Sequence, residues 1–216
     1  MNTDYARLQM VNQQVRGWNV YNEDVLEMLR KLPRENFVPE GFESLAFAEH
    51  EIPLGHGEYM MTPTIEGRLL QALDLRETDK VLEVGTGSGF LTACLARLAA
   101  HVTSIDIHGE FVADAGHKLE QEGIDNVTLV HMDAMRELPD GPFDAVAVTG
   151  SVQRFDPRFV EALSEHGRLF IVVGDAPAME AKLVERTDAH DWHSISLFET
   201  NLKPLVHGAM PPQFVF

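Results

Sequence analysis

The most constraining feature of this chain is a short apolar strand that leads into a glycine-rich turn. Residues 81–90 read VLEVGTGSGF, so glycine occurs at every second position from 85 to 89. Glycine has no Cβ and tolerates positive φ, which lets the backbone of such a turn approach a small ligand closely. A strand, a glycine turn and a helix in this order are typical of α/β folds that bind nucleotide-like ligands. We therefore expect an α/β core that holds its ligand at this turn.

Strands and helices alternate from residue 80 onward. Apolar runs predict strands over residues 81–84, 101–106, 127–131, 143–148 and 168–173. Helices are predicted over residues 88–99, 109–122 and 157–163. This alternation implies right-handed crossovers and a parallel sheet with helices on both of its faces.

The later part of the sequence differs, because two predicted strands follow each other with no helix between them. Residues 181–186 and 194–200 are expected to form an antiparallel pair at one edge of the sheet. The predicted fold class is therefore α/β: a doubly wound, mostly parallel sheet of seven strands in an α/β/α sandwich. The segment 211–216 has no predicted role.

The first part of the chain lacks this alternation. Residues 4–15 read as an amphipathic helix, and Asn22 is a suitable N-cap for a second helix, which Pro33 ends. Residues 54–63 read LGHGEYMMTP, which predicts a loop that leads into a helix over 64–73. We accordingly divide the chain into a helical and glycine-loop extension, residues 1–76, and a core, residues 77–216.

The composition argues against several classes of protein. The net charge is −17, from 34 acidic and 17 basic residues, and no lysine- or arginine-rich block is present, so nucleic acid is not an expected partner. No apolar run approaches the roughly 18 residues that cross a bilayer, so no membrane segment is expected. The single cysteine, Cys94, and the lack of an export signal indicate a cytoplasmic protein.

The spacing of the glycines indicates which ligand the turn holds. Dinucleotide-binding turns follow the pattern G-x-G-x-x-G, and Phe90 stands where the third glycine would be. The pattern E-x-G-x-G-x-G instead resembles motif I of the methyltransferases that use S-adenosyl-L-methionine. Glu83 would then place negative charge near the sulfonium and ammonium groups of this cofactor, and a purely structural turn is the alternative. The predicted contacts at the turn are Glu83, Gly85, Thr86, Gly87, Ser88 and Gly89.

An aspartate at the end of the next strand supports this interpretation. Asp106 follows Gly85 by 21 residues, and a carboxylate there can accept hydrogen bonds from two ribose hydroxyls. Its alternative role is the N-cap of the helix that follows. Ile107 adjoins it and is predicted to contact the cofactor as well.

Two further strand ends are predicted to reach the cofactor. Asp133 follows the strand 127–131, at the edge of the sheet where the ligand crevice lies, and in the methyltransferases the matching acid lies beside the adenine. A solvated loop aspartate is the alternative. Ala134 adjoins Asp133. Thr149 ends the strand that resembles the methyltransferases' fourth, whose end faces the transferred methyl group, and Ser151 is a further candidate there.

One methyltransferase family is similar to this chain over nearly its whole length. The sequence resembles the protein-L-isoaspartate O-methyltransferases, and the specific signal is PRENFVP followed at the right distance by the glycine loop. The matching segments are residues 33–39, 52–57, 81–89, 167–169, 173–174 and 202–205. The resemblance implies a twisted, mostly parallel sheet and S-adenosyl-L-methionine as cofactor. It also implies methyl transfer to the α-carboxylate of isoaspartyl residues in damaged proteins.

The sequence departs from this family in the glycine loop. The family has a serine, usually called catalytic, where this chain has Met61, and a glutamine where it has Glu58. A thioether donates no hydrogen bond, and an acidic loop would repel a carboxylate substrate. The family's Gly-Asp-Gly becomes MDA at residues 132–134, which keeps only the acid.

The missing serine does not by itself abolish the reaction. A carboxylate acceptor is already ionised near pH 7, so the enzyme needs no general base and mainly positions the acceptor. One lost hydrogen bond costs roughly 1–3 kcal/mol, or about 10- to 100-fold in rate. We predict that Met61, Thr62 and His56 meet the acceptor, with Thr62 as a substitute donor, and that Met60 contacts the cofactor. Core packing is the alternative for the two methionines, and a structural role in the loop is the alternative for His56.

Three functions remain open from the sequence. The first is methylation of isoaspartyl residues in a protein or peptide. The second is methylation of a different, small apolar acceptor, for which Met60 and Met61 would line an adaptable pocket. The third is a non-catalytic cofactor-binding protein. The ten histidines show no metal-ligand spacing, so no metal is predicted, and the oligomeric state stays open.

Overall fold

A computed structural model describes residues 3–188 and 191–208; the segment 211–216 lies outside this part. Within it, the central sheet has seven strands, in the order β5-β4-β3-β6-β7-β8-β9. They are β3 (Lys80–Val84), β4 (His101–Asp106), β5 (Val127–His131), β6 (Phe143–Val152), β7 (Leu163–Asp175), β8 (Ala178–Arg186) and β9 (Trp192–Thr200). β3 to β7 pair in parallel, and β8 and β9 pair antiparallel at one edge, which confirms the predicted fold class.

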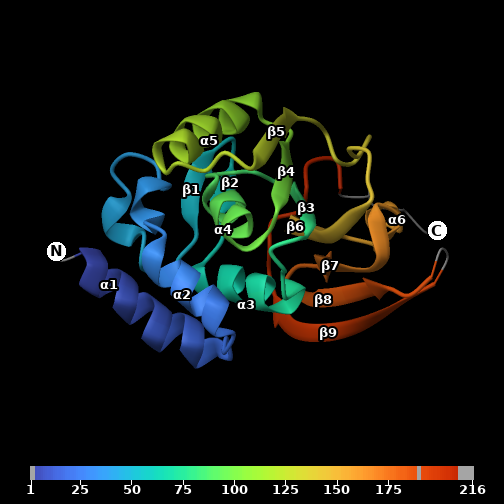
Figure 1. Ribbon diagram of the computed structural model, residues 1–216, viewed down its shortest axis with the longest axis horizontal. Coiled ribbons are helices and arrows are strands. Elements are labelled where there is room, and N and C mark those ends of the chain that lie inside the picture. The colour runs from blue at the N-terminus through green and yellow to red at the C-terminus, as the bar shows by residue number, and fades with distance from the viewer. Residues whose placement is uncertain (1–2, 189–190, 209–216) are drawn as a thin grey trace, which may run out of the picture.

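Helices cover the sheet and extend the molecule at one end. The α-helices are α1 (Thr3–Gln9), α2 (Glu23–Lys31), α3 (Pro63–Leu73), α4 (Phe90–Leu98), α5 (Gly109–Gln121) and α6 (Arg158–Glu161). The helical turns η1 (Met10–Val15), η2 (Arg16–Trp18), η3 (Arg34–Asn36) and η4 (Glu43–Leu45) complete the N-terminal part. Figure 1 shows α1 and α2 at one end of the molecule and the β8–β9 pair extending toward the other. Among the residues that the structure describes, none of the helices combines the length and the apolar character that a membrane span requires.

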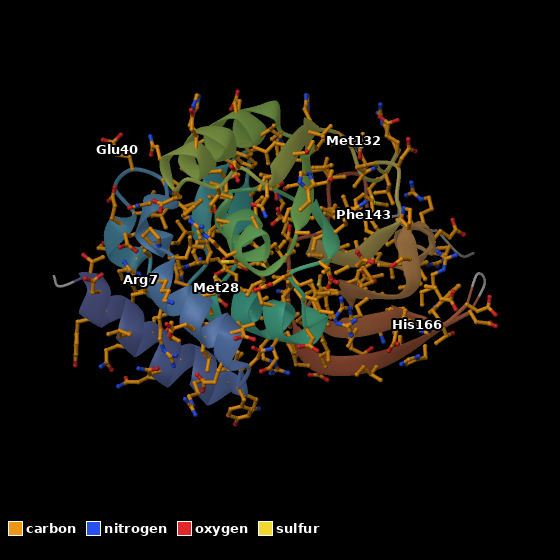
Figure 2. The ribbon with its side chains drawn as sticks, in the orientation of Figure 1. Arg7, Met28, Glu40, Met132, Phe143 and His166 are labelled. Atoms are coloured by element: carbon orange, nitrogen blue, oxygen red, sulfur yellow. The ribbon has the colours of Figure 1, made fainter. Side chains whose placement is uncertain are left out.

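The alternation of side chains along the strands divides the core into two layers. On β3, Val81 packs in the layer that contains α2, α3 and α4, whereas Leu82 packs in the layer that contains α6. Phe143 at the start of β6 and Met132 after β5, both labelled in Figure 2, belong to this second layer. Apolar contacts on both faces are what a doubly wound sheet requires.

The glycine loop differs from its prediction. Residues 54–63 are not a simple loop, because β1 (Ile52–Gly55) and β2 (Glu58–Met60) form an antiparallel hairpin of their own. Its turn has positive φ at Gly55, His56 and Gly57, at 102°, 51° and 73°. This tight reversal brings Ile52 opposite Met60, and both side chains are buried.

Other element boundaries shift for local reasons. The Asn22 side chain accepts from the N–H groups of Asp24 and Val25, which confirms the predicted N-cap. The helix predicted over 88–99 begins at Phe90, because Gly89 has a φ of 83°, which is not helical, and so the helix does not extend to Ser88. The helix predicted over 157–163 is a single turn, and β7 begins directly after it.

Candidate active site

A cavity lies where the carboxyl ends of the parallel strands meet the β1–β2 hairpin. Its lining comes mainly from residues 58–61, 84–88, 105–108, 132–135, 149–150 and 202–206. The ends of β3, β4, β5 and β6 thus form one side, and the hairpin and a late segment form the other. This is the crevice in which open α/β sheets bind ligands. The structure brings together residues from opposite ends of the sequence.

The glycine turn packs against the end of β6. A Cβ at Gly85, whose φ is 100°, would lie 2.1 Å from Oγ1 of Thr149. The same Thr149 hydroxyl lies 2.8 Å from the carbonyl oxygen of Val84 and 3.0 Å from that of Gly85. Only glycine fits at position 85, and Thr149 fixes the turn from the neighbouring strand.

Asp106 joins the turn to the end of β4. Its carboxylate accepts from the backbone N–H of Gly87 at 2.9 Å and from that of His108 at 2.8 Å. Each oxygen keeps a further lone pair for a ligand hydroxyl. Burial raises the pKa of Asp106, and the two N–H donors oppose this shift. Both Asp106 and Ile107 line the cavity, and the ribose contact stays a prediction.

Glu83 lies away from the cavity, contrary to the charge expected near a cofactor. Its carboxyl group is fully buried and accepts from the hydroxyls of Thr92 and Ser104. Burial raises the pKa of Glu83 to about 8, so it is largely protonated at neutral pH. Ser104 in turn lies 2.7 Å from the hydroxyl of Thr86, which lines the cavity. Glu83 reaches the site only through these hydroxyls.

Asp133 lines the cavity and already holds several donors. It accepts from the N–H of Met135 at 3.0 Å and lies 2.8 Å from Nδ1 of His207 and 3.2 Å from Nε of Arg136. An ionised carboxylate has about four acceptor positions, so one remains for a ligand amine. Ala134 lines the cavity beside it. The contact with His207, 74 residues later, gave no signal in the sequence.

Met60 and Met61 line the cavity on the side of the hairpin, and both are at least nine-tenths buried. The backbone carbonyl of Met61 accepts from the Arg34 guanidinium at 2.7 Å, which fixes its position. Thr62 is outside the lining, and its hydroxyl lies 3.3 Å from that of Thr64. It therefore supplies no donor to the cavity in this arrangement.

His56 also lies outside the lining. It occupies the hairpin turn, where its ring stacks on His108 with 4.4 Å between ring centroids and its Nε2 lies 2.9 Å from Glu110. Gly89 is likewise absent from the lining, while Ser88 lines the cavity and accepts from the N–H of Phe90 at 3.2 Å. Ser151 is buried and donates to the carbonyl of Leu202.

Lys203 is the principal lining residue that sequence reasoning missed. Its Nζ donates to the backbone carbonyl of Gly57 at 2.7 Å and to Glu58 at 2.6 Å. Glu58 is therefore paired, and the loop does not carry the free negative charge expected from the sequence. Lys203 lies in the matching segment 202–205, but nothing in that segment indicates that its side chain contacts a hairpin about 145 residues earlier.

The residues present fit S-adenosyl-L-methionine. The turn at 85–87 has no Cβ at its glycines, Asp106 faces the cavity with spare lone pairs, and Asp133 stands at the next strand end. The remaining lining includes apolar side chains such as Leu91, Ile105 and Phe111, which suit an adenine ring. The cavity thus combines exposed backbone, carboxylates and apolar side chains, which are the groups that bind an amino-acid tail, a ribose and an adenine ring.

Comparisons with known proteins agree with the geometry. A protein-L-isoaspartate O-methyltransferase from Koribacter versatilis is 36% identical, covering 93% of this chain and 90% of its own length. One from Aliivibrio salmonicida is 32% identical, covering 94% and 98%. A structure described as a protein-L-isoaspartate O-methyltransferase from Plasmodium falciparum, in complex with S-adenosyl-L-homocysteine, superposes with a TM-score of 0.81. It covers 92% of this chain and 97% of its own at 19% identity, a likeness of fold.

The family model covers the N-terminal part, the glycine turn and the late segment alike. The model of the protein-L-isoaspartate(D-aspartate) O-methyltransferases matches residues 6–208. The matched range includes both the cofactor side of the cavity and the hairpin side. The chain is therefore a member of the protein-L-isoaspartate(D-aspartate) O-methyltransferase family, and with it an S-adenosyl-L-methionine-dependent methyltransferase.

Proposed function

We propose that this protein transfers a methyl group from S-adenosyl-L-methionine to the carboxylate of an isoaspartyl residue in a protein or peptide. The main support for this proposal is a single cavity that is lined by the strand ends on one side and by the hairpin on the other. Gly85, Gly87 and Asp106 lie on one side, and the hairpin with Met61 lies on the other. A donor held at the strand ends would meet an acceptor at the hairpin.

The cofactor supplies an activated methyl group on a positively charged sulfur. Asp106 would hold the ribose hydroxyls, Asp133 the adenine amine, and the backbone at 85–87 the amino-acid tail. The acceptor carboxylate is ionised at neutral pH, so no side chain has to remove a proton. The buried Met60 and Met61 exclude water and hold the acceptor in line, which is the main source of acceleration in such a transfer.

Turnover on a defined peptide tests the proposal. The purified protein is incubated with radiolabelled S-adenosyl-L-methionine and a peptide that contains either isoaspartate or ordinary aspartate at one position. Labelled, base-labile methyl ester on the isoaspartyl peptide alone supports the proposal. Equal labelling of both peptides, or of neither, contradicts it.

A second candidate function follows from Met61. This residue lines the cavity where the family has a hydroxyl, and its side chain brings an apolar, adaptable surface to the acceptor end. Such a wall favours a small apolar acceptor. Labelling of a metabolite extract that is insensitive to competing isoaspartyl peptide supports this candidate over the first.

A further inference from the structure

We infer that Lys203 binds the carboxylate of the methyl acceptor and thereby determines which acceptors this site takes. The inference rests on the proposed function, because it assumes an acceptor with a carboxylate. It assigns to a residue of the late segment 202–206 the recognition that Met61 cannot provide.

The cavity offers few hydrogen-bond donors to a carboxylate. Among the described side chains that line it, Lys203 is the one lysine or arginine. The hydroxyl of Thr149 is already bonded to two backbone carbonyls, and that of Thr86 is paired with Ser104. Met61 donates nothing. Tyr59, Ser88 and His108 also bring hydroxyl or ring N–H groups to the lining. A charge-assisted hydrogen bond is roughly twice as strong as a neutral one, so a carboxylate at the hairpin end finds its strongest donor in the Lys203 ammonium.

Hydrogen bonds to the end of β6 hold the backbone around Lys203 in place. Ser151, near the end of β6, donates its N–H to the carbonyl of Lys203 at 2.9 Å and accepts from the N–H of Leu205 at 2.9 Å. The Ser151 hydroxyl donates to the carbonyl of Leu202 at 2.8 Å. These bonds fix the backbone of the late segment on the strand end where Thr149 meets the glycine turn. From there the ammonium reaches across to the hairpin turn.

The ammonium group of Lys203 has more donors than its two partners use. A lysine has three N–H donors, and two of them are used, toward the carbonyl of Gly57 and toward Glu58. The side chain of Lys203 is 42% exposed and that of Glu58 is 22% exposed, so the third donor is accessible. Glu58 orients the ammonium, and its negative charge moderates the affinity for an anion. The pair thus sets the strength of carboxylate binding.

The experiment measures acceptor binding without turnover. The protein loaded with S-adenosyl-L-homocysteine is titrated by calorimetry with an isoaspartyl peptide and with the same peptide carrying the carboxamide. Wild type is expected to prefer the carboxylate by roughly tenfold, as a partly exposed charge-assisted hydrogen bond provides. Lys203→Met removes this preference, and Lys203→Arg retains it. Glu58→Gln strengthens carboxylate binding severalfold, because it leaves the ammonium charge uncompensated.

Lys31→Met is the matched control. Lys31 is also paired with a glutamate, Glu27 at 3.0 Å, but lies on α2 outside the cavity lining. This variant should keep the wild-type preference. A wild type without preference, or a Lys203→Met variant that keeps it, overturns the inference. If Lys203→Met fails to fold by thermal melting, the Glu58→Gln result decides: unchanged carboxylate affinity overturns the inference.

The outcomes separate this inference from the proposed function. Preferential binding of the carboxylate peptide without methylation would contradict the proposed function and leave the role of Lys203 supported. Methylation of the isoaspartyl peptide with an unchanged KM in Lys203→Met would support the proposed function and contradict the role of Lys203. An effect on KM with kcat largely kept is the expected signature of a binding residue.

Discussion

Nη1 of Arg34 donates to both carboxylate oxygens of Glu66, at 2.9 and 2.7 Å, and both side chains are almost completely buried. The same guanidinium holds the carbonyl of Met61. Burial raises the pKa of Glu66 to about 7, although Arg34 opposes the shift. The PRENFVP segment thus connects a buried ion pair to the wall of the cavity.

Replacement of Arg34 should therefore be costly. Arg34→Met leaves the Glu66 carboxylate buried without its partner, and we expect the free energy of unfolding to fall by roughly 3–5 kcal/mol at pH 8. Urea denaturation measures this change. Arg16→Met is the control, because Arg16 forms an exposed pair with Glu23 and should cost less than about 1 kcal/mol. Equal losses in the two variants would contradict the assignment.

Glu83 predicts a pH dependence of stability. Its pKa is about 8 in the folded protein and 4.5 is its ordinary value, so the folded state retains a proton that the unfolded state has lost. Stability contributed by this group therefore falls as pH rises from about 4.5 to 8, by about 1.4 kcal/mol per pH unit. Glu83→Gln cannot ionise, and its stability relative to wild type should increase over this range and level off above pH 8. Parallel pH curves for the two proteins would refute the prediction.

Asp106 should control cofactor affinity. Asp106→Asn keeps one acceptor oxygen and loses the charge, so we expect the Kd for S-adenosyl-L-homocysteine to rise roughly 10- to 100-fold by calorimetry. Asp144→Asn is the matched control, because Asp144 accepts from Lys80 N–H and the Ser164 hydroxyl outside the cavity lining. A similar rise in both variants would show that Asp106 acts only on the fold.

Two glycines separate backbone strain from steric clash. Gly85→Ala and Gly123→Ala both place a Cβ at positive φ, 100° and 63°, and each should destabilise the protein by roughly 1–2 kcal/mol through strain. At Gly85 the Cβ also collides with Thr149, whereas nothing lies within 4 Å at Gly123. Only Gly85→Ala should weaken cofactor binding, and Thr149→Ala in the same chain should restore part of it. Calorimetry and thermal melting test both statements.

A serine at position 61 tests the acceptor. Met61→Ser introduces the hydroxyl of the family pattern, and kcat/KM on an isoaspartyl peptide should rise by roughly 10- to 100-fold. Met60→Ser makes the same chemical change in the neighbouring buried residue and should give no gain. A folded Met61→Ser variant with unchanged kcat/KM would favour the apolar acceptor instead.

Local sequence patterns predict the sheet and identify the strand ends that line the cavity. The glycine turn, the strand ends at Asp106 and Asp133 and the helices between them depend on contacts close in sequence and on the rule that parallel strands end at one edge. Glu83 is the exception. Its carboxyl group points into the core, where one oxygen accepts from Thr92 and Ser104, and a motif alone does not reveal side-chain direction.

The hairpin side of the cavity depends on contacts between distant parts of the chain. The hairpin strands β1 and β2 have only four and three residues, too few for a clear alternation of apolar and polar positions. Lys203 contacts Glu58, 145 residues earlier, and His207 contacts Asp133, 74 residues earlier. No sequence spacing predicts either pair. Such contacts depend on the tertiary fold, and the periodicity of apolar residues in the sequence does not predict them.

The two walls of the cavity belong to different parts of the architecture. The side with the glycine turn consists of strand ends, whereas the hairpin forms a separate two-stranded sheet and segment 202–206 pairs with the main sheet at an isolated bridge, Ser151 to Pro204. Substitutions in these two segments change the hairpin side of the cavity without altering the pairing among the parallel strands, to which neither segment belongs. Under the proposed function, acceptor choice is therefore free to diverge in evolution while the strands that hold the methyl donor are inherited unchanged.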